Sequence, residues 1–429
     1  MSNNLTIPHR PRKKSRRMGQ VNVVSREDYA DSDLNTRVEL IKGLIPIGLM
    51  EVAALLQEEV ETLTGGWHAR KGDDEVGVRY GSNPGSVRLG GQRIPVRVPR
   101  VRGDQGEVPL ESYRSLHAGH GEVDETLLKR VLHGISCRNY EGAVEAIPGA
   151  IGLSSSTVSR SFVAASAAQL KQFHERDLSG EEYVALFLDG KSFAGSMMVV
   201  TLGITIHGKK RILGFVETDT ENKKVITRFL RSLLARGLDV SRGILAIIDG
   251  AKGLRAGVRA AFASRVVVQR CAWHKRENVV SYLPKADQAS WSKRLQRAMD
   301  RPTYKEAHSS LKELLKELDD INQSAAASLR EGFEELLTLH RLGLFAKLGR
   351  SFKTTNCLEN VNSLLEKRCG KVNHWKNSNQ RHRWVAAALL DIEPRFRTVC
   401  GYNHLPALRD AVGRELRIEK TAAAVSKAA

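Results

Sequence analysis

Two apolar runs that each end in Asp-Gly decide the fold predicted for this chain. They read YVALFLDG at residues 183–190 and ILAIIDG at residues 244–250. An unbroken apolar run of this length before a turn residue is typical of a buried strand. Three more strands are predicted at residues 197–206, 211–216 and 266–268. Amphipathic helices are predicted at residues 221–236 and 252–263. The order βββ-α-β-α-β predicts a mixed α/β sheet.

The acids that end these two runs are the first candidate site residues. Asp189 and Asp249 are each predicted to follow a buried strand directly, and each precedes a glycine. Ligands of open α/β sheets bind beyond the carboxyl ends of the strands. In a sheet of the ribonuclease H-like kind the first and fourth strands are neighbours, so both carboxylates would meet. Their repulsion needs a cation, and oxygen ligands suit Mg²⁺ or Mn²⁺. The alternative is that each aspartate only caps an element.

A third carboxylate is expected on the helix that starts in TTNCLENVN, residues 354–362. Asn356, Glu359 and Asn362 recur at steps of three and so share one helix face. A carboxylate between amides suits a polar pocket, which favours Glu359. From the residues alone, other glutamates stay open as candidates: Glu277, Glu331 and Glu366.

The remaining C-terminal segments predict helices. Residues 275–350 contain Leu-rich and Lys/Glu-rich stretches and predict an all-helical section. Two further helices are predicted at residues 354–368 and 380–393, and residues 401–429 are expected to form a tail.

The N-terminal third is basic and contains a candidate DNA-binding strand. Residues 1–36 predict a flexible basic tail, residues 40–63 a helix, and the glycine-rich residues 65–91 a break. RIPVRVPRVR at residues 93–102 alternates apolar side chains with arginines, which predicts an edge strand with one basic face. Either this face is merely solvated or it contacts phosphates through its arginines: Arg93, Arg97, Arg100 and Arg102.

A helix-turn-helix pattern follows. A short helix, the glycine-bearing turn at residues 148–153 and a second helix opened by Ser and Thr fit this motif. The second helix would present Ser155, Thr157 and Arg160 to a DNA groove. An ordinary helical hairpin has the same pattern and remains the alternative.

Composition and charge limit the class of protein. The chain has 429 residues with 67 Lys and Arg against 48 Asp and Glu, a net charge of +19. Such an excess indicates a polyanionic partner, of which nucleic acid is the default candidate. Five scattered cysteines do not make a disulfide scaffold. Without an apolar run long enough for a membrane span or a signal region, a cytoplasmic protein is expected.

The motifs together resemble those of the DDE transposases of the Mutator superfamily, specifically bacterial insertion-sequence transposases. The resemblance rests on LDG at 188–190, IDG at 248–250, CAWHK at 271–275 and TTNxxExxN at 354–362. Asp249 lies 60 residues after Asp189, and Glu359 a further 110. One departure is Asn360, where relatives usually carry Ser or Gly.

The resemblance implies roles and domain boundaries. Asp189, Asp249 and Glu359 would be the catalytic residues and bind two Mg²⁺ or Mn²⁺ ions. Residues 180–274 and 351–400 would form a ribonuclease H-like core interrupted by the all-helical insertion at 275–350. The preceding regions, residues 37–120 and the helix-turn-helix-like residues 121–175, would bind DNA.

Cys271 and His274 form a Cys-x-x-His pair with two possible roles. The pair is half of a tetrahedral zinc site, but no second pair at ligand spacing follows. The resemblance implies instead that Cys271 and His274, with Asn362, support the active site. The neighbouring Trp273 is either a core residue or a platform for an unpaired base.

The implied function is DNA transposition. The protein would bind the terminal inverted repeats of an insertion sequence, cleave the 3′ ends and join them to target double-stranded DNA. Two ends must be held together, so a homodimer or larger synaptic assembly on the bacterial nucleoid is expected, with no membrane partner. Two alternatives are a DNA-binding descendant without catalysis, which would be free to lose the acids that are intact here, and a nuclease that cuts without joining.

Overall fold

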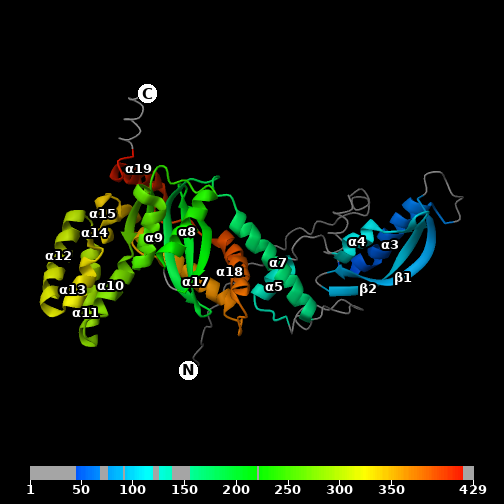
Figure 1. The fold of residues 1–429 in the computed structure, drawn as a ribbon, viewed down its shortest axis with the longest axis horizontal. Helices are drawn as coiled ribbons and strands as arrows, with labels where there is room; N and C mark the ends of the chain where they lie inside the picture. The colour runs from blue at the N-terminus through cyan, green and yellow to red at the C-terminus, as the bar shows by residue number, and fades with distance from the viewer. Residues whose placement is uncertain are drawn as a thin grey trace, which may run out of the picture. The chain divides into compact units, whose positions relative to one another are not determined.

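The computed structural model describes residues 45–67, 76–89, 92–118, 125–137, 155–219 and 222–418 (Figure 1). The chain divides into two compact units. The smaller unit comprises Met1–Gly121 and Val144–Leu153, and the larger comprises Glu122–Ala143 and Ser154–Ala429. The predicted basic tail at residues 1–36 and the predicted turn at residues 148–153 lie outside the described residues.

The smaller unit packs two helices on a three-stranded antiparallel sheet of order β1-β2-β3. Its elements are α3 (Ile45–Thr64), β1 (Val78–Leu89), β2 (Gln92–Gly103), β3 (Gly106–Val108) and α4 (Glu111–Ala118). Apolar side chains three and four residues apart on α3, such as Val52 and Leu56, pack with Val87, Ile94 and Val101 of the sheet. The predicted helix is therefore confirmed.

One prediction for the smaller unit is wrong, because β2 lies between β1 and β3 and is not an edge strand. The predicted break of the helix at residue 65 is confirmed, since α3 ends at Thr64, but the strand β1 within the glycine-rich segment was not predicted. Its glycines have a packing reason: a Cβ on Gly85 would meet Val98 at 2.5 Å and Tyr113 at 2.7 Å, and Gly81 has a φ of +76° where the register shifts.

The larger unit is built on a five-stranded mixed sheet of order β6-β5-β4-β7-β8, which confirms the predicted α/β sheet. β4 pairs antiparallel with β5, and β5 with β6, whereas β4, β7 and β8 are parallel. The strands are β4 (Tyr183–Phe193), β5 (Ser196–Thr205), β6 (Lys210–Thr218), β7 (Ile244–Ile248) and β8 (Val266–Arg270).

Both faces of this sheet are covered, which explains the unbroken apolar run of β4. Leu186 and Leu188 pack in one core with α8 (Lys223–Ala235) and α9 (Lys252–Phe262). Phe187, which lies between them on the opposite face, contacts Phe352 with ring centroids 5.6 Å apart. Leu186 to Leu188 are all fully buried as a result.

A run of helices follows β8, as predicted, and contains no strand among its described residues. Its members are α10 (Ala272–Val280), α11 (Lys285–Met299), α12 (Tyr304–Ile321), α13 (Gln323–Arg330), α14 (Phe333–Leu336), α15 (Thr338–Arg341) and α16 (Phe345–Phe352). They enclose a core of their own around Trp291, Leu311 and Leu329. Thr303 and Glu306 form a reciprocal capping box that fixes the start of α12.

The chain then returns to the sheet. α17 (Asn356–Cys369) contacts β4, and α18 (Ser378–Ile392) contacts β6 and α7 (Ser155–Glu175). The tail predicted at residues 401–429 is wrong in part, because α19 (Leu405–Glu415) buries Leu405, Leu408 and Val412 and contacts β4 and β7. The other elements are α5 (Glu125–Leu132), η1 (Ala263–Arg265), η2 (Glu393–Arg395) and η3 (Tyr402–His404).

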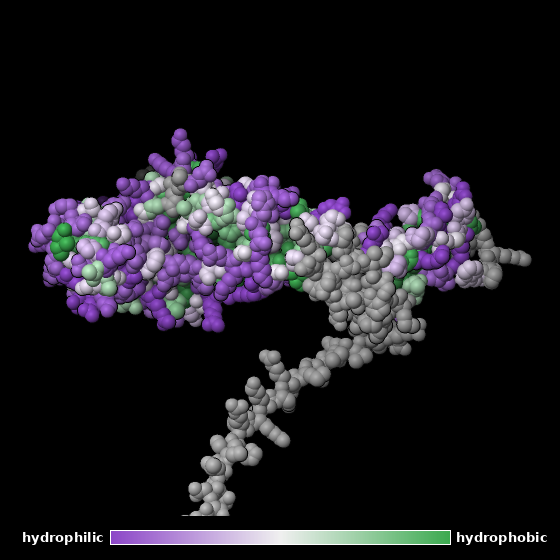
Figure 2. Space-filling model, turned by 90° about the horizontal axis from the view of Figure 1, so that it is seen from below, coloured by the Kyte–Doolittle hydropathy of each residue, from purple (hydrophilic) through white to green (hydrophobic). Residues whose placement is uncertain are grey.

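The surface is polar. The face of the larger unit in Figure 2 is mostly hydrophilic. None of the helices in the described part of the chain combines the length and the apolar character needed to cross a bilayer.

Candidate active site at the end of the parallel strand pair

Asp189 and Asp249 lie on neighbouring parallel strands. The pairing of β4 with β7 ends at Leu188 and Ile248, and each aspartate is the next residue. Asp189 does not end its strand as predicted, because β4 continues to Phe193 and Asp189 pairs with Val200 of β5. The two acids nevertheless meet where the parallel pair ends. Asp249 Oδ1 accepts a hydrogen bond from the Ala251 N–H at 3.0 Å, which fixes the turn into α9.

The electrostatics of Asp189 bring the three predicted acids into one site. Asp189 is only 6% exposed. Burial, together with the charges of Asp249 and Glu359, raises the pKa of Asp189 to about 7, and the positive charge of His274 opposes this rise. A buried carboxyl that interacts with two other acids carries an excess of negative charge, which a cation would offset.

Thr355 connects Cys271 and His274, which follow strand β8, to Glu359, the third predicted acid. Its N–H and Oγ1 donate to Cys271 Sγ at 3.4 and 3.5 Å. The same Oγ1 lies 3.4 Å from His274 Nδ1 and 3.3 Å from Glu359 Oε1. Cys271 itself continues the sheet ladder, because its N–H donates to the Ile248 carbonyl at 2.8 Å. Glu359, one turn into α17, is thereby linked to the segment beside Asp249.

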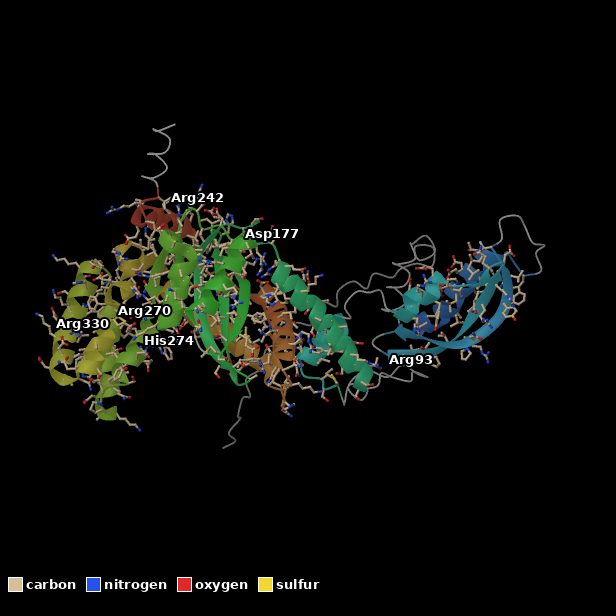
Figure 3. The ribbon with its side chains drawn as sticks, in the orientation of Figure 1. Arg93, Asp177, Arg242, Arg270, His274 and Arg330 are labelled. Carbon is tan, nitrogen blue, oxygen red and sulfur yellow. The ribbon has the colours of Figure 1, made fainter. Side chains whose placement is uncertain are left out.

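Cys271 and His274 form a polarised pair beside the acids. Burial lowers the pKa of His274, but its hydrogen bond to Cys271 and the negative charges of Cys271, Asp189 and Asp249 outweigh burial and raise the pKa to about 9. Burial raises the pKa of Cys271, but hydrogen bonds from His274 and Thr355 bring it below its usual value. His274, near the start of α10 (Figure 3), is therefore a cation at neutral pH whose charge acts on the carboxylate of Asp189.

The implied divalent ions fit the chemistry of these side chains. Three carboxylates offer hard oxygen ligands, and the raised pKa of Asp189 is the mark of an uncompensated negative charge. In the part of the chain that the structure describes, no group of three or more His, Cys, Asp or Glu side chains already has the geometry of a metal site. The three carboxylates nevertheless supply the type of donor that a divalent ion needs.

The other candidate glutamates have partners elsewhere. Glu331 pairs with Lys275 and Arg270, Glu366 with Lys191, and Glu277 with Arg276. None of these three acids is among the charges that shift the pKa of Asp189, whereas Glu359 is. Asn362 is buried on α17, three residues beyond Glu359.

Sequence reasoning missed two residues of this region. Thr355 stands in the quoted motif, but its contacts with Cys271 and His274 join it to a segment more than 80 residues earlier in the chain. Arg270 is 1% exposed and donates to the Gly250 carbonyl next to Asp249 (Figure 3). The one signal in the sequence for Arg270 was a charged residue two positions after the apolar run at residues 266–268.

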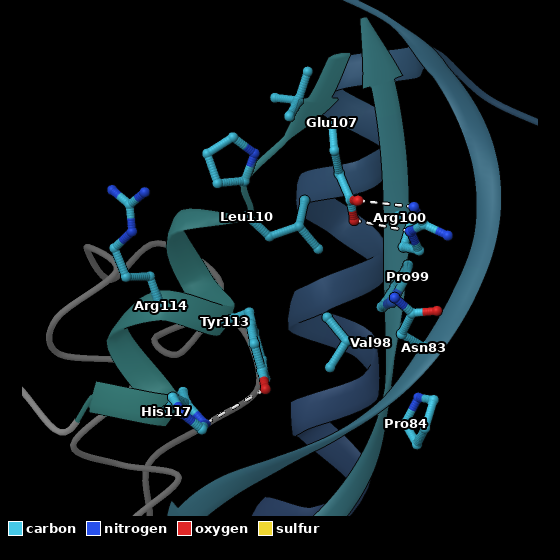
Figure 4. Close-up of a pocket in the computed structure, with 12 residues that line it drawn as sticks. Asn83, Pro84, Val98, Pro99, Arg100, Glu107, Leu110, Tyr113, Arg114 and His117 are labelled. Carbon is cyan, nitrogen blue, oxygen red and sulfur yellow. Dashed lines mark hydrogen bonds and ion pairs between the residues drawn. The ribbon is translucent and has the colours of Figure 1, made fainter.

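The predicted DNA-contacting arginines of β2 have different surroundings. Arg100 donates two hydrogen bonds of 2.8 Å to Glu107, so its charge is neutralised (Figure 4). Arg93 Nε donates to Ser86 Oγ at 2.7 Å. Arg97 is exposed and has no ion-pair or hydrogen-bond partner among the described residues. Arg102 lies over the Tyr80 ring at 5.1 Å.

Exposed aromatic side chains accompany these arginines, which the sequence reasoning did not single out. Tyr80 and Trp67 are both exposed, and Arg79 lies 4.9 Å from the centre of the Trp67 ring. Arginine with exposed aromatic rings is a combination typical of nucleic-acid surfaces.

The predicted helix-turn-helix residues begin α7. Ser155 and Arg160 are exposed and Thr157 is half-buried. The preceding helix and turn of the motif lie outside the described residues, so the motif stays a prediction.

The structure is that of a mixed α/β protein. At its sheet a buried aspartate interacts with two other acids and with the positively charged His274. The family model for the Mutator family of transposases matches residues 21–398, and the chain belongs to that family.

Insertion-sequence transposases are among its relatives. It is 25% identical over 317 residues to the transposase for element IS256 in transposon Tn4001 from Staphylococcus aureus, covering 71% of this chain and 78% of that protein. It is 28% identical over 294 residues to the IS6120 transposase from Mycolicibacterium smegmatis, covering 67% and 88%. It is 29% identical over 293 residues to the IS406 transposase from Burkholderia multivorans, covering 64% and 72%.

Proposed function

We propose that this protein is the transposase of an insertion sequence. It binds the terminal inverted repeats of the element, cleaves the phosphodiesters at the 3′ ends and joins those ends to target DNA. The observation that carries the proposal is the electrostatic coupling of Asp189 to Asp249 and Glu359 at the end of the parallel strand pair, in a chain of the Mutator family.

The proposal includes the architecture implied by the sequence. The sheet has the order β6-β5-β4-β7-β8. Its strand β5 runs antiparallel to both β6 and β4, and β7 and β8 run parallel to β4, which supports a ribonuclease H-like core. The helices α10–α16 would be an insertion into that core. Ser155, Thr157 and Arg160 would belong to a helix-turn-helix-type DNA-binding region, and two copies of the chain would hold two DNA ends.

Asp189, Asp249 and Glu359 are the residues that would hold the two Mg²⁺ or Mn²⁺ ions. When bound, such ions activate the attacking hydroxyl and stabilise the leaving oxygen of an in-line displacement. Other residues of the chain position Glu359 and supply a positive charge near the acids. Thr355 aligns Glu359 with His274, and His274 stays protonated up to about pH 9, so it offers a fixed positive charge to the approaching phosphate.

Metal binding should depend on pH through Asp189. The carboxyl of Asp189 holds its proton below a pKa of about 7 in the metal-free protein, and a metal binds only the ionised form. Below pH 7 binding therefore releases this proton, and above it does not. We expect the affinity for Mn²⁺ to rise by up to about tenfold per pH unit below pH 7 and then to level off. Calorimetric titration in two buffers of different ionisation enthalpy measures both quantities.

The control for this prediction is Glu366→Gln on α17, which removes an acid paired with Lys191. It should keep the wild-type pH profile. A flat affinity between about pH 5.5 and 7 in the wild type would contradict the assignment of Asp189.

The salt dependence of DNA binding tests the proposed role of the smaller unit. Arg97→Gln should weaken binding of duplex DNA regardless of sequence, because it removes an exposed cation that has no partner among the described residues. The slope of log K against log salt should fall by about 0.9 per lost phosphate contact. Arg100→Gln should change the slope less, since Glu107 already neutralises Arg100. Equal slopes for wild type and Arg97→Gln would exclude Arg97 from the interface.

One assay separates the proposed function from its alternatives. The full-length protein is incubated with a labelled duplex of the inverted repeat that flanks its coding sequence, a target plasmid and Mg²⁺. Joined product is the expected result. Cut ends without joining would indicate a nuclease, and a shifted band without cutting would indicate a binding protein.

A further inference from the structure

A cavity of about 170 Å³ lies beside the candidate active site, formed by α10, the end of α11 and the segment that leads into α17. Two contacts and one position along α17 place it near that site. The Ala272 N–H donates to the Lys353 carbonyl at 2.8 Å. The Trp273 ring lies 4.7 Å from the ring of His274, edge to face. Asn356 in the cavity wall stands one helical turn before Glu359. A group in this cavity is therefore a near neighbour of the carboxylates.

Trp273 is the unusual member of the cavity wall. Its side chain is 42% exposed, so the interpretation of Trp273 as a core residue is wrong. The rings of Trp273 and His274 form a T-shaped contact with an interplanar angle of 76°. Large aromatic side chains that stay exposed beside a reactive centre offer a flat apolar surface to a ligand.

The rest of the wall has the polarity of a nucleotide subsite. Met299 adds a second apolar surface, and Asn356 has a side-chain amide without a hydrogen-bond partner among the described residues. Two of the cations are already engaged, Arg276 with Glu277 and Lys353 with Asp300. Arg350 is exposed and, within the described ranges, has neither an ion pair nor a hydrogen bond. One stacking surface, one amide and one available cation match a base, its polar edge and its phosphate.

The size of the cavity limits what can enter. Pockets for drug-sized ligands measure roughly 300–1,000 Å³, so this one takes a single ring system. A base pair is too large, and a base inside a duplex is already stacked on both faces. The occupant must therefore be a base that has left the helix, and its unstacking is offset by stacking on a protein ring.

We propose that this cavity receives one extrahelical base of the DNA substrate, stacked on Trp273, next to the scissile phosphodiester. This inference rests on the proposed function, because it needs a DNA strand at the carboxylates. Trp273 is thus a base-stacking residue, and Asn356 and Arg350 hold the edge and the phosphate of the same nucleotide.

The test is a scan of abasic substrates with the full-length protein. Duplexes of the flanking inverted repeat carry a tetrahydrofuran abasic site at each position in turn around the cleaved bond, on either strand. On the intact duplex, Trp273→Ala should slow cleavage by about fivefold to a hundredfold, as expected for one lost stacking contact. With the abasic site at one particular position, wild type and Trp273→Ala should cleave equally fast, because the base that Trp273 receives is gone.

Two variants control this scan. Trp273→Phe keeps an aromatic face and should recover most of the rate. Tyr282→Ala removes another exposed aromatic side chain of the same helical region, away from the cavity, and should behave as wild type. A defect of Trp273→Ala that persists at every abasic position, or no defect on the intact duplex, overturns the inference and leaves the proposed function standing. Absence of cleavage by the wild type with Mg²⁺ overturns both.

Discussion

Asp249→Asn is expected to slow DNA cleavage at least about a thousandfold and to leave binding of the inverted-repeat duplex within about twofold of wild type. The amide keeps the shape of the side chain and its hydrogen bond from Ala251, but removes the negative charge of a proposed metal ligand. A bound metal contributes several kcal/mol to catalysis of this kind, and each 1.36 kcal/mol is a factor of ten in rate. Asp189→Asn and Glu359→Gln should have the same effect. Single-turnover cleavage and gel-shift titration measure the two quantities separately.

The structure supplies matched controls for this prediction. Glu366→Gln lies on the same helix as Glu359, pairs with Lys191 and should cleave at the wild-type rate. Asp189→Asn should not unfold the protein, because at pH 8 it replaces a buried, repelled carboxylate by a neutral amide. Cleavage by Glu359→Gln within tenfold of wild type would show that a different acid completes the site.

Glu335→Ala is expected to cost about 3–5 kcal/mol of folding free energy in the larger unit. Glu335 is buried on α14 and accepts hydrogen bonds from Arg255 at 2.6 Å, Arg259 at 3.0 Å and Arg270 at 3.2 Å. Arg270 is almost completely buried, so the substitution leaves a guanidinium in the interior with only Glu331, at 3.6 Å, as a counter-charge. Removing one partner of a buried ion pair has a cost of this size.

We expect Glu335→Ala also to disturb the candidate active site, because it removes a partner of Arg270. Arg270 donates to the Gly250 carbonyl, and Gly250 follows Asp249. A Cβ on Gly250 would meet the Arg270 guanidinium at 2.1 Å, and its φ is +113°, so the turn tolerates little change. Cleavage by Glu335→Ala should therefore fall even at temperatures where the protein remains folded.

Denaturant titration of the larger unit and cleavage assays at low temperature measure the two effects. Glu334→Ala, at the exposed neighbouring position, should cost less than about 1 kcal/mol. The double variant Arg270→Met with Glu335→Leu should recover most of the stability, since it removes both charges. A stability of Glu335→Ala equal to that of Glu334→Ala would mean that the buried pair contributes little.

The sequence predicts the sheet of the larger unit well because local pattern and burial agree there. Strands buried on both faces give continuous apolar runs, and α8 and α9 show helical periodicity because one face packs on the sheet. β1 was not predicted because its glycines, a usual signal for a turn, are needed for close packing against Tyr113. α19 was not predicted, although its buried residues Leu405, Leu408 and Val412 recur at helical steps of three and four, because the helix is short and begins with Leu-Pro.

The candidate site was predictable in its acids but not in their surroundings. An aspartate that ends an apolar run is visible in the sequence, and so is a glutamate within a motif. The contacts of Thr355 with Cys271 and His274 and the salt bridge of Arg270 to Glu335 join segments about 65 to 85 residues apart. Such partners depend on how the helices return to the sheet, which no local pattern encodes.

The position of α17 after seven helices has a consequence during protein synthesis. A ribosome adds about 5–20 residues per second, so the 170 residues from Asp189 to Glu359 emerge over roughly 10–30 s. Asp249 is added after the first 60 of these residues, and while the remaining 110 are made the growing polypeptide carries both aspartates and lacks the glutamate. If the protein has the proposed function, fragments that end before α17, whether through a premature stop codon or proteolysis, lack the third acid and should not cleave chromosomal DNA.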